Sequence, residues 1–290
     1  MYKTPTKAII TDAGFASRYL PITKTIPKAM IPIGAKPVMQ LCVEECVAAG
    51  ITEIIIVATP GTKSKEIYDD YFHNPASNVK TLLDKQGKSD RFNAVEEILN
   101  FPKITVIEQD ATLPYGNGSP IVSAKSFIND DEAFVVLYSD DLILGKSDVA
   151  TLIEEYQKHP DAKAIITAQE MPESVWHKYG MIALKDNGTL SHIVEKPKTP
   201  DLSPSNLTSY GRYLLTPEVF QYLIPENTGL DNELWTVDAI TKLAKTGDVI
   251  VAKSAGKWIT TGDPKNYFFA HLDYVLNNES YADEVRNVLQ

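Results

Sequence analysis

The chain has 290 residues, of which 43% are hydrophobic and 23% are charged, a composition typical of one large α/β domain or two smaller ones. The formal charge of −10 argues against a nucleic-acid partner, because binding a phosphate backbone requires a concentrated positive face. The longest apolar runs are too short to span a bilayer, and residues 1–6 lack the pattern of a signal peptide. We therefore expect a cytoplasmic protein that has no membrane contact.

In the first half of the chain, apolar runs of strand length alternate with helical patterns. The expected strands are 6–11, 51–58, 104–108 and 133–137, and the expected helices are 38–49, 64–72, 78–100 and 119–127. Strands that alternate with helices form right-handed βαβ units. The pattern predicts an α/β fold that is Rossmann-like, with a mainly parallel central sheet. The long polar segment 78–100 has three open interpretations: a lid, an interface arm or plain surface.

After residue 145 the pattern becomes mixed. Helices are expected at 148–158, 217–223, 236–245 and 264–277, and strands at 162–168 and 208–215. The segments 180–184 and 189–194 flank an Asn-Gly turn and predict a β-hairpin. The segments 249–253 and 257–260 are expected to close the fold as a strand pair. We interpret the chain as a single domain with halves at about 1–145 and 146–290.

Cys42 and Cys46 lie four residues apart in a helical pattern. A disulfide or a metal pair is conceivable, but two small buried residues on one helix face is the favoured interpretation. Nothing in this usage of cysteine calls for an oxidising compartment.

The first strand ends in a loop that is suited to phosphate binding. Gly14 would let backbone N–H groups approach phosphate oxygens, and Arg18 and Lys28 supply positive charge. The prolines of this segment favour a stiff, extended loop over a helix. The glycine spacing fits neither a Walker loop nor a dinucleotide fingerprint. The alternative is an ordinary strand–loop connection with surface cations.

Two further charged pairs lie at strand ends. Asp140 and Asp141 follow the fourth strand, where an Mg²⁺ ligand and ordinary turn chemistry are both open interpretations. Asp141 would support Asp140 or act as an N-cap. Glu195 and Lys196 end the hairpin and form either a ligand site or an exposed ion pair. Adjacent strand residues point to opposite faces, so a pair that points inward requires a bend, which Pro197 would enforce.

The ordered combination of these motifs resembles the sugar-1-phosphate nucleotidyltransferases, and within them the bacterial-type uridylyltransferase branch. The resemblance covers residues 7–277. It rests on segments spread along the chain: Asp12–Pro21, Ile26–Ile33, Lys36-Pro37, Val43–Glu45, Ala48–Ile51, Glu108-Gln109, Tyr115–Gly118, Leu137–Ile143, Tyr179–Ile182, Val194–Lys198, Ser205-Asn206, Gly211–Tyr213 and Asp238–Ile240.

The resemblance implies roles for residues of the first half in binding UTP. Ala13 and Gly14 would cradle the triphosphate, Arg18 would hold the leaving phosphates, and Lys28 would stabilise charge at the α-phosphate. Gln109 and Gly116 would select a pyrimidine base. Asp140 would bind nucleotide-associated Mg²⁺, the expected cofactor.

In the second half, the resemblance implies an acceptor site for glucose 1-phosphate. Gly180, Glu195 and Glu233 would contact the sugar, while Lys196 would grip its phosphate and act with Arg18 and Lys28 in catalysis. The implied products are UDP-glucose and pyrophosphate, made by a homo-oligomer. The same chemistry with dTTP or another sugar 1-phosphate stays open.

Three residues depart from the family pattern. Ala16 replaces a second glycine and would be tolerated if its φ stays negative. Thr260 stands where the family has a second metal-binding aspartate, and Trp235 is unfamiliar next to the acceptor site. Ala16 and Thr260 keep a second class of function open, a weakened paralogue that binds nucleotide or nucleotide sugar and regulates a partner enzyme, while Trp235 keeps an acceptor other than glucose open.

Overall fold

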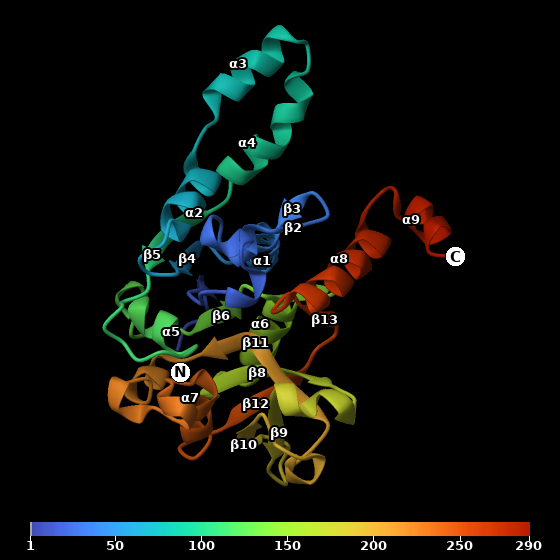
Figure 1. The fold of residues 1–290 in the computed structure, drawn as a ribbon. Helices are drawn as coiled ribbons and strands as arrows, with labels where there is room; N and C mark the ends of the chain where they lie inside the picture. The colour runs from blue at the N-terminus through green and yellow to red at the C-terminus, as the bar shows by residue number, and fades with distance from the viewer. Residues whose placement is uncertain (1) are drawn as a thin grey trace.

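The apolar runs of the first half form the parallel part of a nine-stranded sheet in the computed structural model, which describes residues 2–290. The parallel strands lie in the order β6-β1-β4-β5 (Figure 1). Their bounds are Lys7–Asp12 for β1, Glu53–Ala58 for β4, Lys103–Glu108 for β5 and Phe134–Tyr138 for β6. The prediction of parallel βαβ units for this half is confirmed.

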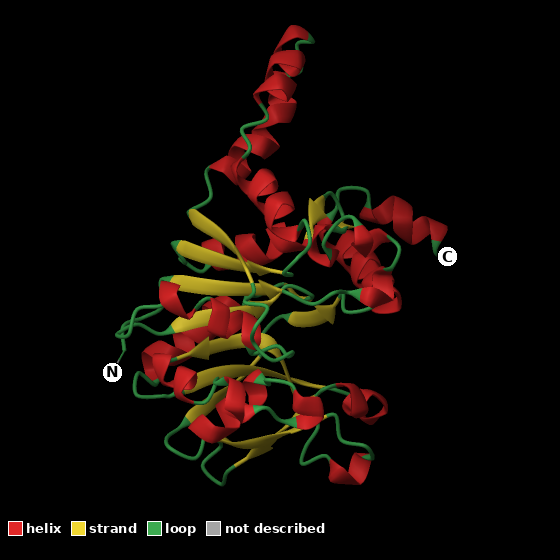
Figure 2. Cartoon of the chain, turned by 60° about the vertical axis from the view of Figure 1, so that its left-hand side comes forward, coloured by secondary structure: helices red, strands yellow, loops and turns green. Residues whose placement is uncertain are grey.

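The apolar side chains of these strands alternate between two cores. In β1, Ala8 and Ile10 point to one core, whereas Ile9 between them points to the other. β4 repeats this pattern, because successive strand residues face opposite sides of a sheet. A strand that is apolar at every position therefore requires cover on both faces. Figure 2 shows the resulting layers, with helices on either side of the strands.

The expected helices are present, but segment 78–100 divides into two α-helices with the 3-10 turn Ser89–Phe92 between them, and the helix Ala282–Val288 is not predicted from the sequence. Two of the expected helices are partly 3-10: 119–127 divides into α5 and a 3-10 turn, and 217–223 is the 3-10 helix Pro217–Gln221. The α-helices are α1 Val38–Ala48, α2 Ser64–His73, α3 Ser77–Lys85, α4 Asn93–Leu99, α5 Ser119–Ser123, α6 Asp148–Lys158, α7 Thr236–Leu243, α8 Pro264–Asn278 and α9 Ala282–Val288.

The second half of the chain makes the other end of the sheet mixed, as predicted. The strand β11, Leu207–Leu215, pairs antiparallel with β6, β8 and β9. The hairpin of β9, Gly180–Leu184, and β10, Leu190–Glu195, is confirmed. The register of β11 on β8, Ala164–Glu170, shifts between Ser209 and Tyr213. At this point β11 changes neighbours from β9 to β6, and the fork lies beside the site described below.

The expected closing strand pair is wrong. β12, Val249–Lys253, pairs in parallel with β8, whereas β13, Lys257–Thr260, pairs antiparallel with β7, Asp141–Leu144. The Ser254 N–H donates to the carbonyl of Ala168, so the chain continues along β8 beyond β12 and cannot turn back into a hairpin. β13 instead reaches the acidic strand end that holds Asp140.

Segment 74–100 is an arm that projects away from the sheet (Figure 1). α3 and α4 lie side by side in it, joined by an ion pair of 2.6 Å between Lys80 and Glu96. No residue of this segment lines either cavity described below, an arrangement that does not favour a lid. Within residues 2–290, no helix combines the length and the apolar character needed to cross a membrane.

One buried ion pair joins three parts of the fold. The Arg212 guanidinium on β11, fully buried, donates to Glu45 of α1 and to the carbonyl oxygens of Tyr138, Gly211 and Asp141. The other carboxylate oxygen of Glu45 accepts from the first N–H groups of α6. This carboxylate therefore balances a buried cation and also caps a helix.

We predict that Glu45→Ala lowers the free energy of unfolding by about 3–5 kcal/mol, because it leaves the Arg212 charge buried without its partner. Glu154→Ala is the matched control, since Glu154 and its partner Lys146 are both 51% exposed. Loss of that pair should cost under about 1 kcal/mol. Urea denaturation of both variants measures the difference, and equal losses would contradict a structural role for the buried pair.

Candidate active site

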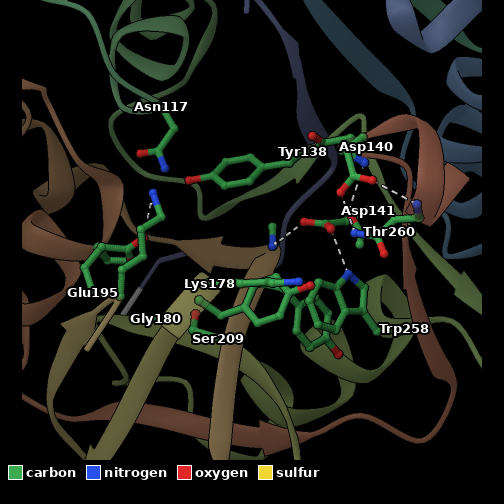
Figure 3. A pocket seen from close by; sticks show the side chains of 18 of the residues that line it. Asn117, Tyr138, Asp140, Asp141, Lys178, Gly180, Glu195, Ser209, Trp258 and Thr260 are labelled. Atoms are coloured by element: carbon green, nitrogen blue, oxygen red, sulfur yellow. Dashed lines mark hydrogen bonds and ion pairs between the residues drawn. The ribbon is translucent and has the colours of Figure 1, made fainter. Parts of the chain in front are cut away.

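Two cavities meet at the carboxyl ends of the parallel strands. The loop cavity, about 450 Å³, lies between the first loop and the segments around Gln109 and Gly116. The strand cavity, about 540 Å³, lies between β11, the end of β10 and Trp258 (Figure 3). Six residues line both cavities: Arg18, Asn117, Tyr138, Asp140, Lys196 and Trp235. The two spaces are therefore adjacent and share a charged boundary.

Asp12 anchors the first loop. Its buried carboxylate accepts hydrogen bonds from the hydroxyls of Tyr68 and Ser139, the latter at 2.8 Å. The Thr59 hydroxyl donates to the carbonyls of Asp12 and Gly14 at 3.0 and 3.2 Å. Burial raises the pKa of Asp12. These contacts fix the backbone of Ala13 and Gly14 along the loop cavity, although the sequence analysis did not single out Asp12.

The remainder of the first loop differs from the expectation of an extended segment. It contains three 3-10 turns, at Ser17–Tyr19, Ile22–Lys24 and Lys28–Met30. The φ of Ala16 is +46°, so the condition that it stays negative is not met. A left-handed alanine is strained by about 1–2 kcal/mol relative to its ordinary conformations. The backbone thus keeps a glycine-like shape at the cavity wall without a glycine.

Asp140, which lines both cavities, forms an ion pair with Lys28, which lines the loop cavity only. The Lys28 ammonium lies 2.7 Å from the Asp140 carboxylate. Burial is the largest influence and acts to raise the pKa of Asp140, but the charge and hydrogen bond of Lys28, a backbone hydrogen bond and the Arg212 charge together hold that pKa below its ordinary value. Asp140 is therefore ionised at neutral pH. Arg18 reaches the same boundary, where it donates to the Gly262 carbonyl at 3.4 Å.

Of the two roles that the sequence position suggests for Asp141, that of an N-cap is wrong. Asp141 does not cap a helix; it begins β7, and it accepts from the Trp258 indole at 2.7 Å and from the Gly211 N–H at 2.9 Å. Burial and the neighbouring Asp140 raise the pKa of Asp141 to about 6. Its side chain ties β7 to β13 and β11 at the wall of the strand cavity, as Figure 3 shows.

Thr260 lies next to Asp140 because β13 pairs with β7. A methyl group on Gly262 would lie 3.3 Å from the Thr260 hydroxyl and 3.5 Å from an Asp140 carboxylate oxygen. The two oxygens thus flank one small space. Among residues 2–290, no three His, Cys, Asp or Glu side chains cluster as a metal site.

Glu195 and Lys196 end β10 at the strand cavity. The bend that the sequence predicts is present, since the φ of Lys196 is +47°. Its ammonium lies 3.5 Å from the Glu195 carboxylate and 4.7 Å from the centre of the Trp235 ring. Burial raises the pKa of Glu195. A side chain on Gly180 would reach Glu195 at 2.9 Å, so this glycine leaves room for the carboxylate.

Gln109, Gly116 and Glu233 all line the loop cavity. Glu233 does not line the strand cavity, but it lies close enough to Glu195 for its charge to raise the pKa of that carboxyl. The φ of Gly116 is +132°, and a Cβ there would lie 2.5 Å from the backbone N and O of Leu234. Gly116 is therefore needed for packing, in addition to the base contact expected from the sequence.

The sequence analysis did not assign Asn117 and Tyr138, which line both cavities. The Asn117 amide oxygen accepts from the Thr236 N–H at 2.8 Å and so orders the start of α7. In the sequence, the position of Asn117 between Gly116 and Gly118 was the one indication that it belongs to the site. Tyr138 ends an apolar strand, and nothing in its sequence position distinguishes it from a core residue.

Residues 7–276 match the family model described as nucleotidyl transferase. The chain belongs to the nucleotidyl transferase family. A UTP–glucose-1-phosphate uridylyltransferase 2 of Staphylococcus saprophyticus is 36% identical over 284 residues, which are 96% of this chain and 95% of that protein. A UTP–glucose-1-phosphate uridylyltransferase of Bacillus subtilis is 35% identical over 284 residues, 96% of this chain and 94% of the relative.

Solved nucleotidyl transferases share the fold. A UDP-glucose pyrophosphorylase complexed with UDP-glucose aligns with a TM-score of 0.79 and 30% identity over 94% of this chain and 98% of the other. A UTP-bound enzyme of the same name from Acinetobacter baumannii aligns with a TM-score of 0.86 and 29% identity over 100% of this chain and 99% of the other. The α/β fold inferred from the sequence is thereby confirmed.

We predict that Gly116→Ala weakens UTP binding at least about tenfold, because the methyl group displaces Leu234 and the wall of the loop cavity. Gly188→Ala is the control: the φ of Gly188 is also positive, +81°, but a Cβ there meets nothing within 4 Å. This control should lose only about 1–2 kcal/mol of stability and keep its affinity for UTP. Isothermal titration calorimetry measures the affinities, and unchanged binding by Gly116→Ala would contradict the packing argument.

Proposed function

We propose that this chain is a UTP–glucose-1-phosphate uridylyltransferase, which forms UDP-glucose and pyrophosphate. The observation that carries the proposal is the pair of adjacent cavities with a cationic boundary. A nucleotide in the loop cavity and a sugar phosphate in the strand cavity would bring their phosphates together at Arg18, Lys28 and Lys196. The similar uridylyltransferases described above, which are named for UTP and glucose 1-phosphate, support the choice of substrates.

The reaction is a substitution at phosphorus. A phosphate oxygen of glucose 1-phosphate attacks the α-phosphorus of UTP, and the bond from this phosphorus to the bridging oxygen of the β-phosphate breaks. The electron pair leaves with pyrophosphate. Positioning the reactants and neutralising the charge that develops supply most of the catalysis in such a transfer. This chain needs no covalent intermediate.

The cations divide this work by position. Arg18, which lies in the outer part of the boundary, would hold the leaving phosphates through its planar donors. Lys28, which is nearly buried, would stabilise charge on the α-phosphate. Lys196 faces both cavities and would hold the phosphate of the sugar, while Glu195 and Gly180 would contact its hydroxyls.

The remaining predicted contacts lie in the loop cavity. Gln109 and Gly116 would contact the pyrimidine, and Glu233 would approach the sugar from the nucleotide side.

Asp140 and Thr260 fit a magnesium ion that is bound together with substrate. Their oxygens flank one small space, and Mg²⁺ at nucleotide sites takes one or two carboxylates, substrate phosphates and waters. When bound, Mg²⁺ would neutralise and align the phosphates. Lys28 would then share Asp140 with the ion and turn toward the α-phosphate.

Pyrophosphate release tests the proposed function. UTP with glucose 1-phosphate is assayed with Mg²⁺ beside dTTP and galactose 1-phosphate. Fastest release with UTP and glucose 1-phosphate supports the proposal. Faster release with dTTP or with galactose 1-phosphate would assign this chemistry to other substrates.

We predict that Lys28→Met lowers kcat/KM about 10²–10³-fold, the loss usual for removing one donor to developing charge. Lys24→Met is the matched control, because Lys24 is exposed in the same loop. Steady-state kinetics of the two variants measures the effect. Comparable activity of the two variants would exclude the proposed role of Lys28.

Thr260, in place of a second metal-binding carboxylate, favours one further function: a regulatory protein that binds nucleotide sugar and turns over slowly.

We predict that Thr260→Asp lowers the Mg²⁺ concentration required for half-maximal activity, since it adds a second anionic oxygen beside Asp140. Thr260→Asn is the neutral control, and Mn²⁺ binding followed by electron paramagnetic resonance provides a readout independent of turnover. Equal metal affinity in the two variants would show that residue 260 does not contribute to the metal site.

A further inference from the structure

The side chain of Asn117 lies at the boundary between the two cavities in a fixed orientation. Asn117 is half-buried and lines both cavities. Its amide oxygen accepts from the Thr236 N–H at 2.8 Å. Because Thr236 is fully buried, this N–H needs an acceptor, and a reversed amide would turn its NH₂ group toward another donor. The oxygen of Asn117 therefore faces the start of α7, and its nitrogen is left for another partner.

The amide nitrogen of Asn117 is open to the cavities. It makes no hydrogen bond within residues 2–290, and it is not among the buried atoms there that lack a partner. A nitrogen that has no partner and is not buried is accessible to a ligand. Figure 3 shows the amide end of Asn117 directed into the pocket. Two N–H donors are therefore presented at the boundary.

The backbone on both sides of Asn117 is tied to one residue of the facing segment. The Leu234 N–H donates to the Tyr115 carbonyl at 2.7 Å, and the Gly118 N–H donates to the Leu234 carbonyl at 2.8 Å. A Cβ on Gly118 would lie 2.9 Å from that carbonyl oxygen, so the glycine permits the close approach. The fold thus fixes the position of the Asn117 amide before a ligand binds, which lowers the entropy lost on binding.

Lys196 brings a positive charge to the same facing segment. Its ammonium lies 4.7 Å from the ring centre of Trp235, the residue directly before Thr236. The Trp235 indole donates to the Leu230 carbonyl at 3.1 Å, which holds the ring in place. Lys196 and Trp235 line both cavities, as Asn117 does. A cation and a neutral donor therefore flank the short segment Trp235-Thr236.

The chemistry of these two groups matches a phosphate. An ammonium group only donates hydrogen bonds, and the amide of Asn117 has only its donors left, because Thr236 occupies its oxygen. The oxygens of an ionised phosphate only accept, whereas a sugar hydroxyl both donates and accepts. In the strand cavity, Glu195 supplies the acceptor that sugar hydroxyls would need.

We propose that Asn117 is a further catalytic residue, which donates a hydrogen bond to the phosphate of the sugar 1-phosphate beside Lys196. This inference rests on the proposed function, in which Lys196 holds that phosphate. In the product UDP-glucose, the same phosphate is the one that carries the sugar. The alternative is that Asn117 acts through its oxygen alone, as a support for the start of α7.

The two interpretations predict opposite results for Asn117→Asp, which keeps an oxygen for Thr236 and replaces the donor with an anionic oxygen. Asn117→Ala removes both groups. We expect UDP-glucose to bind Asn117→Ala about tenfold more weakly than the native chain, the loss typical of a hydrogen bond to a charged group. It should bind Asn117→Asp at least about tenfold more weakly again, because the new carboxylate repels the phosphate. If Asn117 only supports α7, Asn117→Asp should bind as the native chain does, since an acidic side chain suits a helix N-terminus.

Calorimetry gives the Kd values, and Asn187→Asp is the matched control for the added charge. The Asn187 oxygen also accepts from a backbone N–H, that of Thr189 at 3.1 Å, but Asn187 is exposed and lines neither cavity. This control should bind UDP-glucose with native affinity. UMP lacks the phosphate that carries the sugar, so Asn117→Ala should bind UMP with native affinity and bind UDP more weakly. The melting temperature of Asn117→Asp without ligand should exceed that of Asn117→Ala.

Native affinity of Asn117→Asp for UDP-glucose would overturn the proposal, as would an equal loss for UMP in Asn117→Ala or an equal loss in Asn187→Asp. These outcomes are distinguishable from failure of the proposed function, because binding requires no turnover. If pyrophosphate release is fast and Asn117→Asp binds as the native chain does, the enzyme functions as proposed and Asn117 only supports α7. If release is absent and the expected order of affinities is found, Asn117 is a phosphate donor in a protein that does not catalyse the proposed reaction.

Discussion

The buried guanidinium of Arg212 is the contact on which the site geometry depends. It bonds the carbonyl oxygens of Tyr138 and Asp141, which lie on either side of the strand end that presents Asp140. Glu45 balances its charge and holds the start of α6 at the same time. Desolvating such a pair is expensive, and its geometry must therefore be well satisfied. The turn after β6 is consequently rigid, although it carries two adjacent carboxylates.

The two carboxylates in this turn have different environments, and their roles follow from the difference. Asp140 faces Lys28, which keeps it ionised and ready to exchange partners when phosphates arrive. Asp141 accepts hydrogen bonds from two N–H donors, and burial together with the neighbouring charge of Asp140 raises its pKa. In the proposed function Asp140 would therefore belong to the reacting centre, whereas Asp141 belongs to the scaffold. A sequence of two aspartates cannot separate these roles, because the separation comes from partners far away in the chain.

The sequence predicted what local periodicity determines. The parallel strands, the β9–β10 hairpin and the bend at Lys196 follow from apolar patterning and turn residues, and the structure confirms them. The pairing of β13 with β7 was missed because it depends on where β12 leaves the edge of the sheet. The positive φ of Ala16 is also set by tertiary contacts. The strand ends brought the expected site residues to the two cavities, whereas their roles toward substrate stay predictions.

Several locally unfavourable features of the fold gather at the two cavities. Ala16, Lys196 and Asp231, which line the cavities, adopt left-handed backbone conformations. Elsewhere the two cores are packed from residues that suit their strands and helices. Strain persists only where surrounding structure enforces it, and it concentrates where ligands bind. Backbone that is fixed in this way at the cavity walls would hold the proposed phosphate partners in one geometry.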